Sequence, residues 1–234
     1  ILGAQPAARV GQHAEPHAPA EMPAAHGEGR PQHGRQILVR APQHGERLGP
    51  IERVVGECPL GERPVGSRPD EHPTRVVDHR AFSDRGAFET EIDAALRAAS
   101  VDIACLAGFM RLLTGPFVAR WRDRLINIHP SLLPAYKGLD THTRALADGV
   151  RFVGCTVHFV RPAMDDGPII VQAAVPVLPG DDAAALAARV LAAEHRCYPL
   201  AVRLIAERRV RVEGNRVTTD GGKIPDRAVL NPMD

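Results

Sequence analysis

From about residue 74 onward, short apolar runs alternate with longer amphipathic stretches. The run 101–107 is almost continuously apolar, as expected for a strand in a parallel sheet that is covered on both faces. The stretch 85–99 instead places apolar residues at helical spacing, after Ser83 and Asp84, either of which can cap a helix. This alternation predicts an α/β fold with a mostly parallel sheet.

The same patterns predict the remaining elements of this part of the chain. Strands are expected at 75–78, 126–128, 154–160 and 168–177, followed by a small hairpin at 209–212 and 216–217. Helices are expected over 113–122, 141–147 and 183–208, with Pro199 bending the last of them.

Residues 1–72 differ sharply in composition from the rest of the chain. They contain no Phe, Tyr, Trp, Lys, Thr or Asn and are rich in Pro, Gly, His and Arg. A segment with so little aromatic and branched apolar mass cannot offset the entropy of ordering it, so we expect irregular or disordered structure. Short strands near 36–40 and 52–55 are the expected exceptions. The predicted organisation is an atypical segment 1–72, a folded domain 73–218 and a flexible tail 219–234.

Charge and composition narrow the classes of partner. The formal net charge of +1 provides no electrostatic attraction for nucleic acid or an anionic membrane. No apolar run approaches the ~18 residues of a transmembrane helix, and no secretory signal is visible. The four cysteines form no C-x-x-C pair, which favours buried reduced thiols over a zinc site. We therefore expect a cytoplasmic protein with small-molecule ligands, either a monomer or a homodimer.

Two polar residues interrupt the apolar run at 125–128 and its Pro-bounded end. Asn127 and His129 stand two positions apart, and an extended strand points such residues to one side. An amide can hold the oxygen of a carbonyl under attack, and an imidazole can move a proton near neutral pH. The pair is therefore a candidate for acyl-group chemistry. The alternative is that both side chains only satisfy hydrogen bonds at a strand end.

A second polar cluster, Asp165-Asp166, precedes Gly167-Pro168 between two predicted strands. A carboxylate on such a turn can reach a neighbouring strand end, where it would favour the protonated form of an imidazole and align a water. The alternative is that Asp165 and Asp166 are ordinary turn residues, which Asp-Gly sequences often contain.

Five motifs together make the chain resemble the glycinamide ribonucleotide formyltransferases of purine synthesis. The likeness runs from about residue 76 to residue 217, with the motifs in the family's order. The motifs are Cys105-Leu106-Ala107-Gly108-Phe109-Met110-Arg111-Leu112-Leu113, Asn127-Ile128-His129-Pro130-Ser131-Leu132-Leu133-Pro134, Gly138-Leu139-Asp140-Thr141-His142, Gly154-Cys155-Thr156-Val157-His158-Phe159-Val160 and Asp165-Asp166-Gly167-Pro168-Ile169-Ile170.

The resemblance implies a Rossmann-like formyltransferase fold. The implied reaction moves a formyl group from 10-formyltetrahydrofolate to the amine of 5-phosphoribosylglycinamide, without a metal. In that reaction His129 would be the acid, Asn127 would hold the formyl oxygen, and Asp165 would support His129 and position a water. These roles agree with those that the residues themselves indicate.

The resemblance also implies binding residues. Main-chain groups of Met110, Arg111, Leu112 and Leu113 would receive the pterin ring, and Arg85 would touch the folate. Glu194 would contact the glycinamide substrate. A solvated helix-end charge is the alternative for Arg85, and an ordinary exposed helix position is the alternative for Glu194. We assign no catalytic role to His142 or His158, because a strand histidine is more often a satisfied interior group.

The front of the chain departs from the family pattern. The family opens with an apolar strand, a Ser-Gly-x-Gly-Ser-Asn loop and a helix, which cradle the substrate phosphate. Here Gly27-Glu28-Gly29-Arg30 and His33-Gly34-Arg35 are the nearest candidates; neither follows an apolar strand, and neither has the Ser-Asn pair. We hypothesise that residues 1–72 are read in the wrong frame of a GC-rich gene, which translation of the other two frames would test. A divergent N-terminal extension is the alternative.

The missing cradle has consequences for function. We expect the chain as written to show weak or absent turnover and poor stability. Two alternative functions therefore stay open. One is a formyltetrahydrofolate deformylase, and the other is a non-catalytic, folate-binding pseudo-enzyme.

Overall fold

The computed structural model describes residues 35–39, 54–56, 74–109, 111–221 and 225–232. Most of the segment 1–72 lies outside these residues. The irregular structure expected for that segment therefore falls outside the described part of the chain. Two short strands within it are described, β1 (Arg35–Val39) and β2 (Val54–Gly56). They lie close to the strands expected near 36–40 and 52–55.

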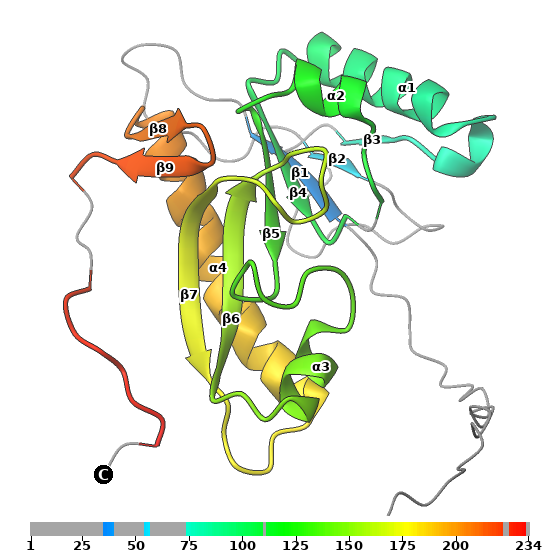
Figure 1. Ribbon diagram of the computed structural model, residues 1–234. Helices are drawn as coiled ribbons and strands as arrows, with labels where there is room; N and C mark the ends of the chain where they lie inside the picture. Colours follow the sequence, from blue (N-terminus) through cyan, green and yellow to red (C-terminus); the bar gives the residue numbers. More distant parts are fainter. Residues whose placement is uncertain (1–34, 40–53, 57–73, 110, 222–224, 233–234) are drawn as a thin grey trace, which may run out of the picture. The chain divides into compact units, whose positions relative to one another are not determined.

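A five-stranded sheet forms the centre of the described fold, in the order β1-β4-β5-β6-β7 (Figure 1). Its further strands are β4 (Ile103–Ala107), β5 (Leu125–His129), β6 (Phe152–Phe159) and β7 (Ile169–Pro176). Strands β4 and β5 pair in parallel, whereas β1 with β4, β5 with β6 and β6 with β7 pair antiparallel.

The α/β class is confirmed, but the expectation of a mostly parallel sheet was wrong for the described strands. Burial explains the error. Strand β4, which contains the apolar run behind the expectation, pairs parallel with β5 but antiparallel with β1. A continuous apolar run therefore shows that both faces of a strand are covered, and not which way the strand runs.

The other predicted elements lie close to their expected positions. The strands are β3 (Thr74–Val76), which pairs with β2, and the hairpin β8 (Val210–Glu213) and β9 (Arg216–Thr219). The helices are the short 3-10 turn η1 (His79–Ala81), α1 (Arg85–Ala98), α2 (Gly115–Arg120), α3 (Thr141–Ala147) and α4 (Ala183–Ala206).

Side-chain caps explain where the longer helices begin. The Asp84 carboxylate accepts a hydrogen bond from the Ala87 N–H and starts α1, and Asp182 does the same for α4 through Ala185. Pro199 lies inside α4, as expected. In the tail, the Asn231 amide donates to the carbonyl oxygens of Arg151 and Val177, which ties this residue to the ends of β6 and β7.

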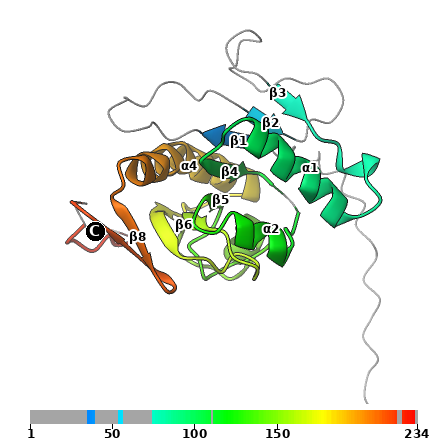
Figure 2. The same cartoon turned by 90° about the horizontal axis from the view of Figure 1, so that it is seen from above.

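Helices cover both faces of the sheet (Figure 2). Helix α4 packs through Leu186, Val190 and Ala201 on one face, against side chains that include Ile126 and Ile128 of β5. Helices α1 and α2 pack on the other face, around Leu125. Because side chains alternate along a strand, Asn127 and His129 lie on the face of β5 that α4 does not cover.

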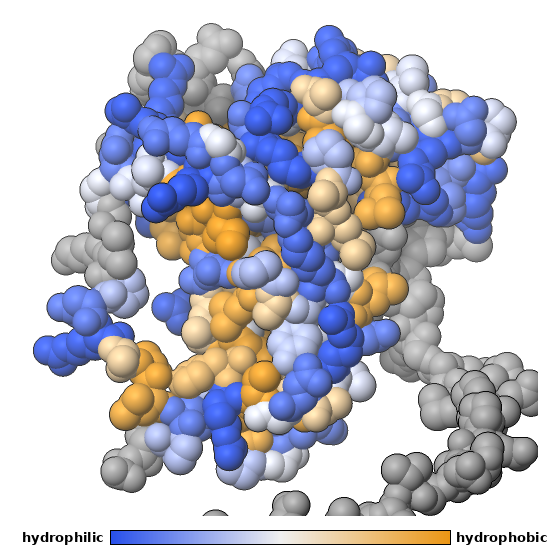
Figure 3. Space-filling model, viewed as in Figure 1, coloured by the Kyte–Doolittle hydropathy of each residue, from blue (hydrophilic) through white to orange (hydrophobic). Residues whose placement is uncertain are grey.

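The surface seen in Figure 3 reflects this arrangement. Hydrophilic residues gather at α1 and around the β8–β9 hairpin, and apolar residues lie over β6 and β7. Among the described helices, none has both the length and the apolar character that spanning a bilayer requires.

Candidate active site

The candidate site is centred on the end of β5 and its neighbour β6. Asn127 pairs across the strands with His158, and His129 pairs with Thr156. Directly paired residues of neighbouring strands point to the same face, so these four side chains share it. The turn between β6 and β7 then brings Asp165 to His129.

His129 is buried, with 6% of its surface exposed, and both of its ring nitrogens face acceptors. Nδ1 lies 3.4 Å from Oδ2 of Asp165, and Nε2 lies 2.9 Å from the carbonyl oxygen of Tyr136. An imidazole can donate to both neighbours at once only when it is protonated. This surrounding suits a group that delivers a proton.

Asp165 connects three parts of the site. Its Oδ2 also accepts the Gly138 N–H at 2.9 Å, and its Oδ1 lies 3.9 Å from Nε2 of His158. The next residue, Asp166, forms an ion pair with Lys137 on the same loop as Gly138. Asp165 is therefore a turn residue, with φ of 49°, and also a neighbour of the imidazole.

Gly167 determines how this turn meets β6. A Cβ atom at this position would lie 1.5 Å from the carbonyl oxygen of Phe159, which no side chain can tolerate. The turn that presents Asp165 therefore requires glycine two residues later.

His158 was assigned no catalytic role from the sequence, but it lies within the site. It is 2% exposed, and burial lowers its pKa, so the ring is neutral at neutral pH. Its Nδ1 faces the Phe159 carbonyl oxygen at 3.0 Å, which places the proton there and leaves Nε2 as an acceptor. Nδ2 of Asn127 lies 3.4 Å from that Nε2. His158 thus orients the amide of Asn127. The period of β6 predicts its face, but only the strand register reveals its partner.

A buried hydrogen-bond network holds the turn after His129. The Thr156 hydroxyl donates to the Ser131 carbonyl oxygen at 2.7 Å and accepts the Leu133 N–H at 3.1 Å. The Gln172 amide donates to the Leu133 carbonyl oxygen and to the Thr156 hydroxyl. These bonds join the turn to β6 and β7, so the position of His129 does not depend on its own strand alone.

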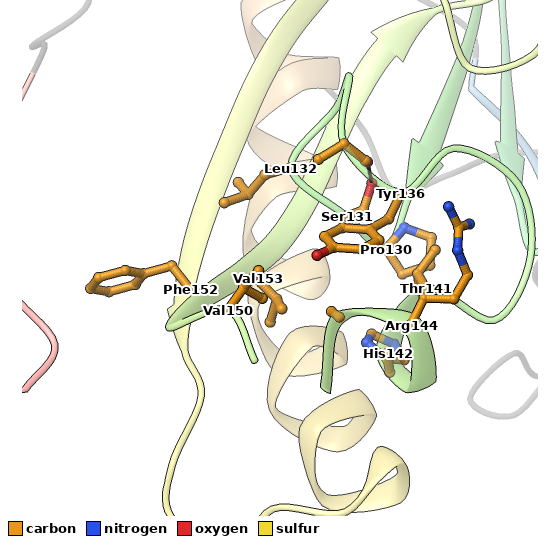
Figure 4. A pocket seen from close by; sticks show the side chains of 12 residues that line it. Pro130, Ser131, Leu132, Tyr136, Thr141, His142, Arg144, Val150, Phe152 and Val153 are labelled. Carbon is orange, nitrogen blue, oxygen red and sulfur yellow. Dashed lines mark hydrogen bonds between the residues drawn. The ribbon is translucent and has the colours of Figure 1, made fainter. Parts of the chain in front are cut away.

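A cavity of about 360 Å³ lies beneath this turn and beside α3 (Figure 4). Its lining residues are Pro130, Ser131, Leu132, Ala135, Tyr136, Thr141, His142, Arg144, Ala145, Val150, Phe152 and Val153. Asn127, His129 and Asp165 do not line it. Nδ1 of His142 is buried without a hydrogen-bond partner, and burial, followed by the charge of His129, lowers the His142 pKa. The cavity therefore adjoins the polar cluster around His129 through Tyr136, although the side chains of that cluster do not line it.

The predicted folate-binding segment lies at the same end of the sheet as His129, where the carboxyl ends of β4 and β5 meet. Strands β4 and β5 are parallel and end at one edge, and residues 111–113 come soon after β4. Leu112 is 54% exposed, whereas Leu113 packs against the cluster of α1 and α2. Met110 lies outside the described residues. Arg85 is exposed at the first residue of α1.

Glu194 is not brought to this cluster. It lies half-buried on α4, the helix that packs against Ile126 and Ile128 on the opposite face of β5. The charge of Glu194 acts to raise the pKa values of the Cys155 and Cys197 thiols. Burial raises the pKa of Glu194 itself to about 7. Hydrogen bonding to a substrate is open to it in either protonation state.

The described cysteines agree with the expectation of buried thiols. Cys105, Cys155 and Cys197 are free and buried, and Cys58 lies outside the described residues. Within the part of the chain that the structure describes, no three His, Cys, Asp or Glu side chains form a group that could hold a metal ion. Metal-free chemistry remains a prediction.

Comparison with known proteins places this chain in a family. The family model described as formyl transferase matches residues 29–202. The trifunctional purine biosynthetic protein adenosine-3 of Homo sapiens is 50% identical over 143 residues, which are 61% of this chain and 14% of that protein. The phosphoribosylglycinamide formyltransferase of Escherichia coli K12 is 43% identical over 152 residues, or 65% of this chain and 72% of that enzyme.

Solved structures agree. Glycinamide ribonucleotide transformylase 1 of Symbiobacterium toebii aligns with a TM-score of 0.62 at 50% identity, covering 63% of this chain and 70% of that one. A formyltetrahydrofolate deformylase of Pseudomonas syringae aligns with a TM-score of 0.59 at 27% identity, covering 63% and 49%. With a family match over more than half of its length, the chain belongs to the formyl transferase family.

Proposed function

We propose that the chain transfers a formyl group from 10-formyltetrahydrofolate to the amine of 5-phosphoribosylglycinamide. The observation that carries the proposal is the convergence of Asn127, His129 and Asp165 at one sheet edge. The names of the Escherichia coli and Symbiobacterium toebii relatives support the same reaction.

Each member of the cluster has a separate task in this reaction. Attack by the amine on the formyl carbon builds negative charge on the formyl oxygen, and the Asn127 amide, oriented by His158, donates to that oxygen. His129 supplies the proton that the departing folate nitrogen needs. Asp165 holds the imidazole through Nδ1 and orients a water that relays protons.

The substrates would approach this cluster from two sides. Met110, Arg111, Leu112 and Leu113 would receive the pterin ring through main-chain groups, with Arg85 touching the folate. Glu194 keeps its proposed contact with the glycinamide substrate on the strength of the resemblance alone. Residues 73–218 would form the catalytic domain, followed by the tail 219–234.

Formyl transfer by the purified chain tests the proposal, with the Escherichia coli relative as a positive control. We expect turnover well below that of the control, because the sequence lacks the loop that holds the substrate phosphate. His129→Asn and Asp165→Asn should remove most of what remains. Transfer that is unchanged in His129→Asn would contradict the proposed role of this residue.

A second candidate function is hydrolysis of formyltetrahydrofolate. Two observations favour it: the missing phosphate loop, and structural similarity to the Pseudomonas syringae deformylase at 27% identity. Release of formate in the absence of the glycinamide acceptor would support it. Folate binding by calorimetry without either reaction would instead identify a non-catalytic folate-binding protein.

A further inference from the structure

We propose that Glu89 is a positioning residue for the folate site, holding the segment 111–114 against helix α1. The proposal rests on the proposed function, because it assigns Glu89 to the binding of the same co-substrate. The residue lies in α1, outside the five motifs that carry the family resemblance.

The contacts of Glu89 are specific. Its side chain is almost fully buried, at 2% exposed. Oε1 accepts the Thr114 backbone N–H at 2.7 Å, and Oε2 accepts the Thr114 hydroxyl. Thr114 is the residue before α2, and its own side chain makes no capping hydrogen bond to that helix. Glu89 thus receives both donors of Thr114 from 25 positions away in the sequence.

Stability alone does not explain a carboxylate at this place. Removing a carboxylate from water costs free energy, and replacing both members of a buried polar pair by apolar groups of the same shape is often neutral or stabilising. What the carboxylate supplies is direction, since two hydrogen bonds from one residue define both the position and the orientation of its backbone.

That backbone belongs to the proposed folate site. Thr114 directly follows the segment 111–113, in which Leu112 is 54% exposed and has little packing to hold it. Arg85, the proposed folate-contacting arginine, lies one helical turn before Glu89 on α1. One carboxylate therefore joins the two segments that would contact the folate, and it sets the distance between them.

Asp93 provides a matched control on the same helix. Its carboxylate accepts the Trp121 indole N–H at 2.8 Å and the Arg97 guanidinium at 2.9 Å. It therefore also links α1 to α2, but at the end of α2 that is remote from residues 111–113. A purely structural link would behave alike at both positions.

The experiment compares Glu89→Gln with Asp93→Asn in the full chain. The readouts are Kd for 5-formyltetrahydrofolate by calorimetry, KM and kcat with 10-formyltetrahydrofolate, and Tm. We expect Glu89→Gln to raise Kd and KM about tenfold with kcat within about twofold, because the binding segment shifts while His129 stays in place. Asp93→Asn should lower Tm by about as much as Glu89→Gln lowers it, but should leave Kd within about twofold of the wild-type value.

Variants of Thr114 test whether the effect passes through this residue. Thr114→Ser keeps the hydroxyl and should retain the original Kd. Thr114→Val removes it and should raise Kd in part, with little further loss when combined with Glu89→Gln. Equal Kd values in Glu89→Gln and Asp93→Asn would overturn the proposal.

The outcomes separate this inference from the proposed function. A wild-type chain that binds folate but transfers no formyl group overturns the proposed function, while the Kd comparison still tests Glu89. A wild-type chain that binds no folate overturns both.

Discussion

Strand β5 has two faces that differ in kind. Ile126 and Ile128 point to α4 and are buried among apolar side chains, whereas Asn127 and His129 point the other way, to partners that are polar. The packing of the apolar face depends on side-chain volume and on the exclusion of water, so this face tolerates apolar substitutions of similar size. The polar face depends on distances between particular atoms. One five-residue strand thus stabilises the fold through one face and presents the candidate catalytic groups on the other.

Substitution of His129 by Asn, on the polar face, should have the largest effect on formyl transfer. We expect formyl transfer to fall at least about a hundredfold, because removing a positioned acid typically costs that much. Tm should change by only a few degrees. Activity and thermal unfolding measured on one preparation check this, and a loss of folded protein in step with activity would argue against a chemical role.

Ile126→Ala should break the apolar face instead. The side chain is fully buried under α4, so we expect a loss of about 3 kcal/mol in the free energy of unfolding. Urea unfolding measures it. Activity per folded molecule should stay close to that of the wild type, and a selective loss of activity would show that the two faces are coupled.

Gly167→Ala should reduce both the stability of the fold and the rate of formyl transfer. The added Cβ would meet the Phe159 carbonyl oxygen, so the backbone must shift and carry Asp165 with it. We expect about 2 kcal/mol of destabilisation together with reduced transfer. Gly180→Ala is a useful control, because an added Cβ at this position meets open space but the backbone has a φ of 81°, which strains any residue other than glycine. This variant should lose stability without a matching loss of formyl transfer.

Glu194→Gln should have the smallest effect and should depend on pH. The folded-state pKa of Glu194 is raised to about 7 by burial, from 4.5. The unfolded chain therefore loses its proton first, and the stability present below about pH 4.5 declines as pH rises to about 7. The amide should thus stabilise the chain at pH 8 by about 1–2 kcal/mol, allowing for a half-buried site, and leave stability at pH 4 unchanged. Equal effects at both pH values would contradict the burial of a neutral acid.

Local pattern was sufficient for the helices and strands of residues 74–219. Asp84 starts α1 because a carboxylate there satisfies a free N–H, and the helical spacing after it needs no distant partner. The shared face of Asn127 and His129 follows in the same way from strand periodicity. The turn 165–166 was a candidate from its own sequence, and the resemblance selected Asp165, which lies 3.4 Å from His129.

Pairing between distant segments was beyond local pattern. The contact of His158 depends on the register that sets it opposite Asn127, and the proposed role of Glu89 depends on how α1 meets Thr114. Strand direction was also misjudged, because burial on both faces has the same sequence signature in parallel and antiparallel strands.

The positions of the helices and strands, and the side of β5 that carries polar groups, could be predicted from the sequence because both follow from interactions within a few residues. Which polar groups meet depends on the tertiary structure. Hydrogen bonds such as those of Glu89 need atoms within about 3 Å, and chain segments 25 residues apart reach that distance only after the sheet and helices have packed.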